Sequence, residues 1–303
     1  MAPSLALGLG TPTRLTLGDQ HNEQDDRPDY GALGATVAGT ATAVRPSRPV
    51  DRSRFYGLLS DHDKVEVNVA TARLEHDLAP TMRLSNHTRF SHTDRNAIYT
   101  VPSAVDVRPD MTTGQVVELV TTNRQAFARE VETLSNQTNL AAQFSLGHTD
   151  HSFAGGLELI REKGHTLRDW TGLGTTGDIS KTVNVTAAGA PTTPTVVNGT
   201  SPYHPNPARL LTGFAPVYAF VDDIRIDTAA LYVYDTLRFN ERWLASGGAR
   251  LERYKASYDV RAIATGVVAP FKVEDTLLTG KLGLVFKPAR AGSLYVSWGL
   301  AAQ

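Results

Sequence analysis

The sequence predicts an all-β fold, an antiparallel up-and-down transmembrane β-barrel to which this chain contributes about ten strands. Three observations predict it. Apolar and polar residues alternate along the expected strands, short turns alternate with long connections, and no stretch approaches the ~20 consecutive apolar residues of a membrane helix. A soluble β-sandwich has no reason to alternate its connections, whereas a transmembrane barrel has short turns on one side of the membrane and long loops on the other.

The connections between expected strands fall into two classes. Four of them have roughly 15 to 60 residues, whereas connections in compact domains usually have about 2–6. The other five are tight turns, and each is separated from the next by a long connection. The tight turns lie at Gly10-Thr11-Pro12, Ala79-Pro80-Thr81, Leu146-Gly147-His148-Thr149, Asn240-Glu241-Arg242 and Ala289-Arg290-Ala291-Gly292.

Period-two alternation defines the first strands. The first hairpin runs from about Ser4 to Leu9 and from Thr13 to Asp25, and a polar loop follows it. In the next strand, Lys64 to Leu78, one parity is apolar and the other is charged, which is typical of a strand with two different faces. The apolar parity holds Ala70, Ala72, Leu74 and Leu78, and the other holds Thr71, Arg73, Glu75 and Asp77.

The strand expected from Met82 to Arg95 places Arg83 and Arg89 on one parity. An arginine near the bilayer midplane costs roughly 2–4 kcal/mol, so this parity is expected to face water or protein. Most of the remaining strands alternate in the same way; Asp227 to Phe239 is assigned from its content of Tyr, Leu and Val, and Trp243 to Tyr258 from the turn before it. They are expected at Glu130 to Ser145, His151 to Glu162, Asp227 to Phe239, Trp243 to Tyr258, Asp275 to Pro288 and Ser293 to Ala301.

Two further expectations concern side chains. Aromatic residues near strand ends predict interfacial girdles, because an amphipathic ring is favoured at headgroup depth. The spacing of Val116, Leu119, Val120 and Phe127 is compatible with a short helix within Thr112 to Val131, inside a long loop. The girdle is expected to contain Phe90, Phe144, Phe153, Trp243, Tyr254, Tyr258, Phe286 and Tyr295.

Composition excludes several classes of protein. The net charge is −1 and charges are scattered, so no basic surface indicates a nucleic-acid partner. The chain has no cysteine, which excludes a disulfide scaffold and a thiolate metal site. No acid/base or nucleophile constellation stands out, so we expect no enzymatic activity and no catalytic residue.

Ordered segments along almost the whole chain resemble the barrel domain of TonB-dependent siderophore receptors, closest to the ferric-catecholate type. They lie at Gly8 to Leu17, Asp25 to Gly31, Phe55 to Leu78, Ala79 to Ser91, Leu134 to Phe144, Gly155 to Glu162, Asp227 to Trp243 and Gly280 to Gly299.

This resemblance implies a bacterial outer-membrane protein in which a 22-strand barrel surrounds a plug domain and imports ferric siderophore with energy from TonB. Residues 1–303 are then expected to form a central part of the barrel without the plug, with short turns facing the periplasm and long loops facing outside. The expected partners are a ferric siderophore, the plug and TonB in the full-length receptor, and outer-membrane lipid. No resident cofactor is expected.

Two sets of residues are candidates for ligand contact, although neither assigns a binding residue. One set is the charged parity, expected to line the lumen, where a hydrated wall is the simpler interpretation. The other is the aromatic residues of the long loops, which suit stacking on a catecholate. The charged set is Arg73, Glu75, Asp77, Arg83, Arg89, Lys281 and Lys287, and the aromatic set is Phe55, Tyr56, Tyr99, Trp170 and Tyr203.

Histidines offer weaker candidates. His148, Asp150 and His151 lie close together in one turn, but two histidines at this spacing lack a further ligand set, so a solvated turn is expected and no metal site. His204 lies in a proline-rich segment that predicts a rigid loop.

Other functions stay open at this point. A passive porin-like channel and a TonB-dependent receptor for a non-iron nutrient are the alternatives within the membrane class. The long connection from Lys163 to Arg225 disfavours the channel. A soluble β-sheet binding module is a third interpretation.

Overall fold

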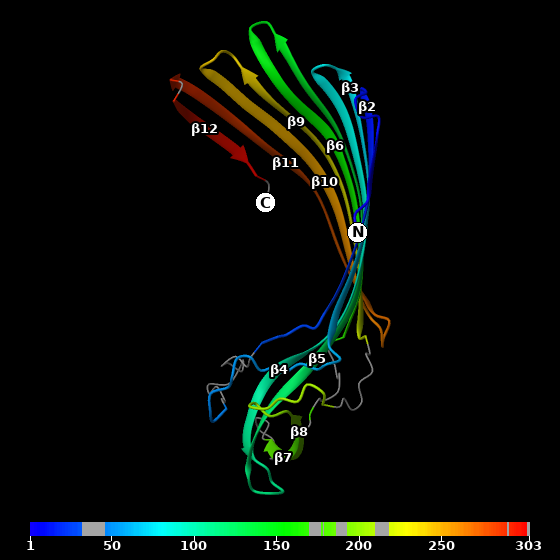
Figure 1. The fold of residues 1–303 in the computed structure, drawn as a ribbon, viewed down its shortest axis with the longest axis vertical. Coiled ribbons are helices and arrows are strands. Elements are labelled where there is room, and N and C mark those ends of the chain that lie inside the picture. The colour runs from blue at the N-terminus through cyan, green and yellow to red at the C-terminus, as the bar shows by residue number, and fades with distance from the viewer. Residues whose placement is uncertain are drawn as a thin grey trace.

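The main element of the computed structural model is one ten-stranded antiparallel sheet with the order β1-β2-β3-β4-β5-β6-β9-β10-β11-β12 (Figure 1). The structure describes residues 1–31, 46–169, 177, 179–185, 193–209, 218–289 and 291–301. The strands are β1 (Ser4–Leu7), β2 (Thr13–Asp26), β3 (His62–Ala79), β4 (Met82–Pro109), β5 (Val116–Leu146), β6 (Thr149–Asp169), β7 (Ile179–Val185), β8 (Thr193–Gly199), β9 (Phe220–Arg238), β10 (Trp243–Ala262), β11 (Val268–Ala289) and β12 (Gly292–Leu300).

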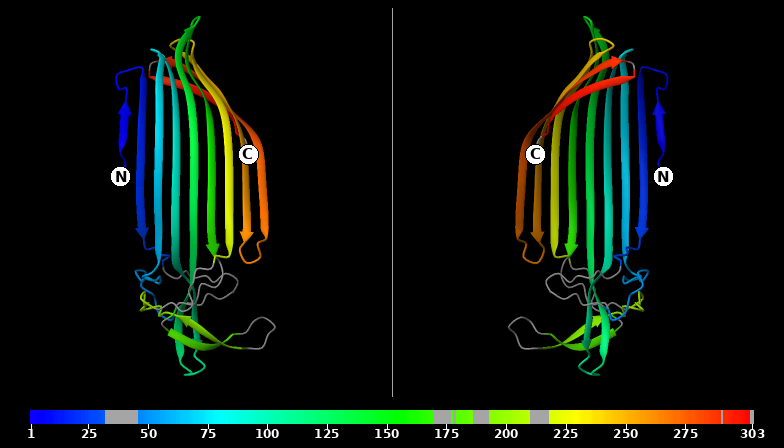
Figure 2. Two further views of the ribbon diagram at one scale, coloured as in Figure 1. Left: turned by 90° about the vertical axis from the view of Figure 1, so that its right-hand side faces the viewer. Right: turned by 90° about the vertical axis from the view of Figure 1, so that its left-hand side faces the viewer.

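The strand topology confirms the up-and-down prediction. The strands of the large sheet lie side by side in chain order, and the excursion between β6 and β9 holds the separate β7–β8 hairpin (Figure 2). Short turns gather at one end of the sheet and the longer connections at the other. Arg290, in the last expected turn, lies outside the described residues. No described segment forms a helix long and apolar enough to span a bilayer.

Two of the four long connections differ from the prediction. Strand β4 has 28 residues and β5 has 31, and only residues 110–115 join them. The helix expected within Thr112 to Val131 is therefore wrong, because this segment pairs with β4 from Val116 onwards. Strands β10 and β11 likewise continue their pairing as far as Arg261 and Val268. A continuous ladder satisfies the backbone groups of these segments as fully as a helix would.

The pairing register sorts the sheet side chains onto two faces, because directly opposite residues point the same way. One face carries the charged parity, including Arg73, Arg83 and Lys281; it is called the inner face here, since the lumen of such a barrel is polar. The outer face carries a broad apolar band. Its leucines are between 39% and 62% exposed, namely Leu74, Leu84, Leu134, Leu157, Leu231, Leu251 and Leu282.

An apolar surface of this extent marks a membrane or partner contact rather than a surface in water. On β6 the band lies between the outer-face residues His151 and Arg161, a span close to the about 9–11 residues that a tilted membrane strand needs. Asn86, Asn136 and Asp235 lie within this band, but on each strand the outer-face residue that follows the last apolar position towards the loop end is polar. These residues are Asp19, Asn68, His92, Glu132, Arg161, Asp227, Arg253 and Thr276.

The register tests one requirement of the predicted aromatic girdle, which is that its rings lie on the outer face. The register places five of the eight rings on the outer face, with Trp243 stacked on Phe286 at 4.4 Å between ring centroids. The assignment is wrong for Tyr254, Tyr258 and Tyr295, which lie on the inner face. A position near a strand end does not by itself place a ring on the outer face, because the parity of the residue along the strand decides which face its side chain takes.

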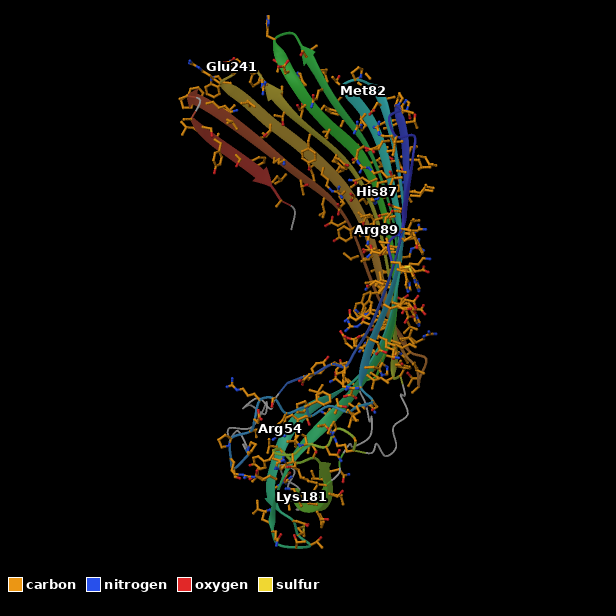
Figure 3. The ribbon with its side chains drawn as sticks, in the orientation of Figure 1. Arg54, Met82, His87, Arg89, Lys181 and Glu241 are labelled. Atoms are coloured by element: carbon orange, nitrogen blue, oxygen red, sulfur yellow. The ribbon has the colours of Figure 1, made fainter. Side chains whose placement is uncertain are left out.

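The fully buried apolar residues gather at the loop end of the molecule. There the ends of β4 and β5 pack with residues 46–61, the β7–β8 hairpin and residues 200–209, a unit called the platform below (Figure 1). Figure 3 shows Arg54 and Lys181 in this unit, with Met82 and Glu241 at the opposite end. The core of the platform includes Tyr56, Leu58, Leu119, Val120 and Val183, each no more than 1% exposed.

Candidate functional site

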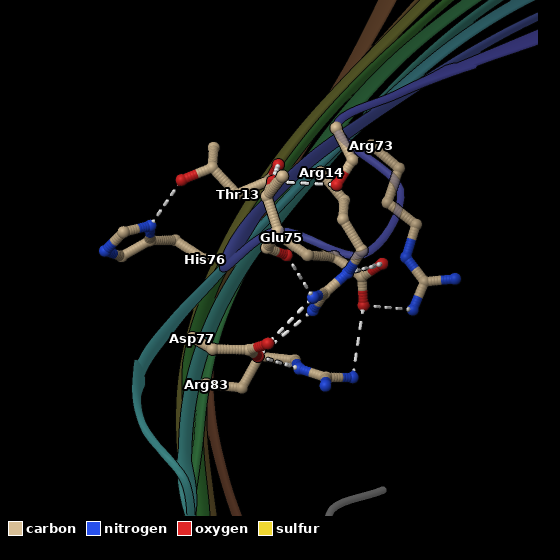
Figure 4. A network of polar contacts seen from close by, with 9 residues as sticks. Thr13, Arg14, Arg73, Glu75, His76, Asp77 and Arg83 are labelled. Atoms are coloured by element: carbon tan, nitrogen blue, oxygen red, sulfur yellow. Dashed lines mark hydrogen bonds and ion pairs between the residues drawn. The ribbon is translucent and has the colours of Figure 1, made fainter.

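The inner face carries a charged cluster beside the short turns. Asp77 accepts hydrogen bonds from both Nη atoms of Arg14, at 2.7 and 3.0 Å, and from Nε of Arg83 at 2.7 Å. Glu75 pairs with Arg73 at 3.0 Å and with Arg83 at 3.6 Å. Figure 4 shows this network on one side of the ribbon and the Thr13–His76 hydrogen bond on the other. Three cations against two carboxylates leave this turn cluster with an excess of one positive charge.

Further along the same face, Arg250 joins two strands. Its Nη2 donates to Glu158 at 2.7 Å and to Glu252 at 2.6 Å. The phenol of Tyr232 accepts from Gln137 at 2.9 Å and donates to Asn139. Lys281, a predicted inner-face residue, lies over the ring of Tyr234 at 5.2 Å. This middle cluster is internally satisfied, as expected of a hydrated wall.

A third inner-face cluster lies beyond the membrane band, where the sheet meets the platform; it is called the mouth cluster. Phe127 of β5 lies directly opposite Arg168 of β6, and Arg168 lies directly opposite Phe220 of β9. The guanidinium of Arg168 covers the ring of Phe220 at 4.9 Å. Rings and a cation therefore alternate across three neighbouring strands.

The row continues onto β4 and the segment before Gly31. Tyr30 stacks on Tyr99 at 4.6 Å, and Tyr99 meets the edge of Phe127 at 6.4 Å. Arg95 covers Phe127 at 5.0 Å, and Arg129 lies 5.8 Å from the same ring. Towards the other side, Tyr258 approaches Phe271 at 6.1 Å between ring centroids.

Carboxylates hold two of these arginines in place. Asp63 accepts from Nε of Arg95 at 2.8 Å, and Asp222 accepts from Nε of Arg168 at 2.6 Å. A third carboxylate, Asp26, lies directly opposite Asp63 on the same face, so three aspartates balance the three arginines. Burial raises the pKa of Tyr99 to about 12, with Tyr30 adding to the shift, so its phenol stays protonated and able to donate a hydrogen bond. The mouth cluster thus offers aromatic faces, cations and a neutral phenol together.

The platform fixes the elements around the mouth cluster through buried polar contacts. Asp61 accepts from the backbone N–H of Leu58 at 2.9 Å and of Thr100 at 3.0 Å, and it pairs with Arg124 at 3.4 Å. Burial lowers the pKa of Arg124, and Asp61 opposes that shift. These bonds tie the segment before β3 to both β4 and β5.

A second set of contacts ties in the segment before β9. Arg209 donates to the carbonyls of Tyr56 at 2.7 Å and Gly57 at 3.2 Å, and the Tyr56 phenol donates to the carbonyl of Pro202 at 2.7 Å. Lys181 forms an ion pair with Asp106 at 2.7 Å with its side chain fully buried. The platform is therefore a packed unit and not a set of independent loops.

Of the predicted loop aromatics, Tyr99 alone among the described ones lies in the mouth cluster. Tyr56 is fully buried, so it contributes to the platform core. The phenol of Tyr203 donates to Glu118, and Arg48 covers its ring at 4.1 Å. Phe55 lies beside Gly57, and Trp170 is outside the described residues. Phe127, Arg168 and Phe220 were missed, because only the strand register brings them together.

The histidine turn is split between the two faces. Asp150 lies on the inner parity and accepts from Ser145 at 2.7 Å, while His151 lies on the outer face, pairs with Asp235 at 2.6 Å and stacks on Phe144. One ion cannot reach both side chains. His204 is exposed in its proline-rich segment. Among the described residues, no group of three or more potential ligands is arranged to hold a metal ion.

Comparison with known proteins agrees with the barrel-like geometry of the sheet. The sequence profile of a family described as TonB dependent receptor-like, beta-barrel, matches residues 3–302. The chain is 31% identical over 306 residues to a probable TonB-dependent receptor, BfrD, of Bordetella pertussis. It is 29% identical over 330 residues to the catecholate siderophore receptor Fiu of Escherichia coli K12. Both alignments cover 100% of this chain but only 39% and 40% of the relatives.

Solved structures show the same fold. The ferric-catecholate import receptor Fiu from E. coli K12, in its open form, matches with a TM-score of 0.77 at 25% identity, covering 100% of this chain and 46% of that one. The siderophore receptor PiuA from Acinetobacter baumannii matches with a TM-score of 0.70 at 22% identity, covering 98% and 41%. The chain thus spans less than half the length of the proteins that it resembles.

Proposed function

Because this chain belongs to the TonB-dependent receptor β-barrel family, we propose that it forms part of the wall of a bacterial outer-membrane receptor that imports a ferric siderophore with energy supplied through TonB. The short turns then face the periplasm and the platform faces outside. The plug and the remaining strands belong to the rest of the receptor, beyond the part of the relatives that this chain spans.

The observation that carries the ligand proposal is the mouth cluster. A ferric catecholate complex presents aromatic rings and negative charge, and the cluster offers rings, arginines and a protonated phenol at the outer end of the inner face. A cation over an aromatic face contributes about 0.5–2 kcal/mol, and an aromatic pair contributes about 0.5–1.5 kcal/mol. The matched relative Fiu is named for catecholate siderophores, which agrees with this chemistry.

The turn cluster suits a second role in the same receptor. Its excess positive charge lies on the inner face beside the short turns, where a plug domain would meet the wall. Acidic side chains of a plug would complete the pairing, because charge complementarity fixes the register of a contact more than it adds affinity. The middle cluster would line the path between the two.

The test measures uptake of radiolabelled iron by iron-limited cells that carry the full-length gene, supplied with defined catecholate or hydroxamate siderophores. We expect uptake with the catecholate and its loss when TonB is deleted. Uptake that persists without TonB would indicate a passive channel. If neither siderophore supports iron uptake, the receptor transports a nutrient other than a ferric siderophore.

The residues are tested by Arg168→Ala and Phe127→Ala. We expect each to weaken catecholate binding about fivefold to thirtyfold, equivalent to about 1–2 kcal/mol, measured by equilibrium binding to purified receptor. Arg161→Ala is the matched control, because it removes an arginine from the outer face of the same strand. If Arg168→Ala and Arg161→Ala bind the ligand equally well, the mouth cluster is not the binding site.

A further inference from the structure

The outer face changes character abruptly where the apolar band ends. Leu159 on β6, Ala229 on β9 and Leu251 on β10 belong to the band, and the next outer-face positions on these strands are Arg161, Asp227 and Arg253. A charged residue this close to hydrocarbon requires a partner at headgroup depth. The register extends this row of charges onto β11 through Glu274, which lies opposite Lys255.

This row contains more cations than carboxylates. Asp227 accepts from Arg161 at 2.6 Å and from Arg225 at 2.7 Å. Glu274 pairs with Arg253 and with Lys255, the latter at 3.2 Å. Four cations against two carboxylates leave an excess of two positive charges, and each of the four cationic side chains is at least half-exposed. Each of them has a carboxylate partner, and its exposed surface leaves room for a further anionic one.

A hollow of about 510 Å³ lies directly beneath these charges. Leu134, Leu159 and Ala229 supply its apolar wall. Arg161, Arg253 and Lys255 stand at its rim, together with the carboxylate of Asp227, which lies between Arg161 and Lys255. The small side chain of Ala229 lies directly opposite Arg253, between longer neighbours, which creates the depression. An apolar hollow with a cationic rim has the shape and polarity of an amphiphile site.

We propose that this hollow binds one phosphorylated lipid of the outer leaflet, with an acyl chain against Leu134, Leu159 and Ala229 and the phosphate between Arg161, Arg253 and Lys255. Guanidinium groups recognise phosphate through paired hydrogen bonds, and a nearby lysine adds a point charge. The apolar wall distinguishes a lipid phosphate from free phosphate, which gains nothing from it. The inference depends on the membrane placement of the sheet and not on the transported ligand.

The experiment uses the full-length receptor in detergent, titrated with phosphatidic acid and followed by native mass spectrometry. Diacylglycerol with the same acyl chains and inorganic phosphate are the comparison probes. We expect phosphatidic acid to bind, with the other two at least tenfold weaker. Lys255→Ala is expected to weaken binding about fivefold, since a basic residue at a membrane surface contributes about that factor. Ala229→Leu, which fills the hollow and leaves the charges, is also expected to weaken it.

Lys287→Ala is the matched control, because it removes the same charge from the inner face near the short turns. Heat-dependent mobility on a gel verifies that each variant is folded. Equal binding of phosphatidic acid and diacylglycerol would overturn the proposal, as would equal effects of Lys255→Ala and Lys287→Ala. Binding of inorganic phosphate as strong as that of the lipid would identify an anion site without a lipid. If the receptor stays soluble without detergent, the sheet does not lie in a membrane and the lipid proposal is wrong. The proposal of siderophore binding is tested separately, by the binding measurements on Arg168→Ala and Phe127→Ala.

Discussion

The membrane-spanning part of the sheet and the platform are built on opposite principles. In the sheet, leucines such as Leu231, 58% exposed, point outward and charged networks point inward. In the platform, Leu119 and Val120 are both completely buried around ion pairs such as Lys181–Asp106. The sheet is one layer thick, so its apolar face needs a covering and its polar face needs water or protein. The platform supplies its own core, and it therefore determines where the mouth cluster is held.

The largest expected effect is on the platform. Asp61→Ala leaves the buried guanidinium of Arg124 without its carboxylate and removes the acceptor for Thr100, which should cost about 3–5 kcal/mol. Hydrogen exchange of the amides in residues 46–61 should rise strongly, while that of β9 and β10 near the short turns should not. Asp63→Ala, which breaks a half-exposed pair with Arg95, is the control and should cost about 1 kcal/mol or less. Equal protection in both variants would contradict an independent platform core.

This contrast explains where sequence reasoning succeeded. In β3 and β4, lipid constrains one face and water the other, so period two is visible from Lys64 to Arg95. In the platform both faces of β5 are covered. Leu119 and Val120 point to opposite faces of the strand, yet both are buried. Apolar residues therefore do not alternate with polar ones along this segment, and their spacing resembled that of a helix.

The second-largest expected effect concerns the apolar band on the outer face. Leu157→Arg places a cation on the outer face and should destabilise the folded receptor in lipid by roughly 2–4 kcal/mol if it lies near the midplane. Ile160→Arg, on the same strand but on the inner face, is the matched control and should be close to neutral. Denaturant unfolding in lipid vesicles measures both. A reversed order of stability would mean that inner and outer faces are exchanged.

The candidate site was less predictable than the fold for a related reason. Phe127, Arg168 and Phe220 are far apart in the sequence and none belongs to a motif. Their proximity depends on the register of three strands, two of which flank the excursion that contains β7 and β8. Residue type alone suggested Tyr56 and Tyr203 instead, and the structure uses both of these to hold the platform together.

The smallest effect tests the boundary between the two regions, where Tyr99 lies. Its phenol pKa of about 12 means that the folded protein holds this proton more tightly than the unfolded chain, whose tyrosines titrate near 10. The associated stability is present below pH 10 and is lost as the pH rises towards 12. Burial also raises the pKa values of Tyr56 and Tyr258, so a titration of tyrosinate absorbance should show several late-titrating phenols, of which the one near pH 12 disappears in Tyr99→Phe. In Tyr30→Ala that phenol should titrate earlier, because Tyr30 adds to the shift. If Tyr30→Ala left it unchanged, Tyr30 would not be stacked on Tyr99 in solution, and the mouth cluster would end at Tyr99.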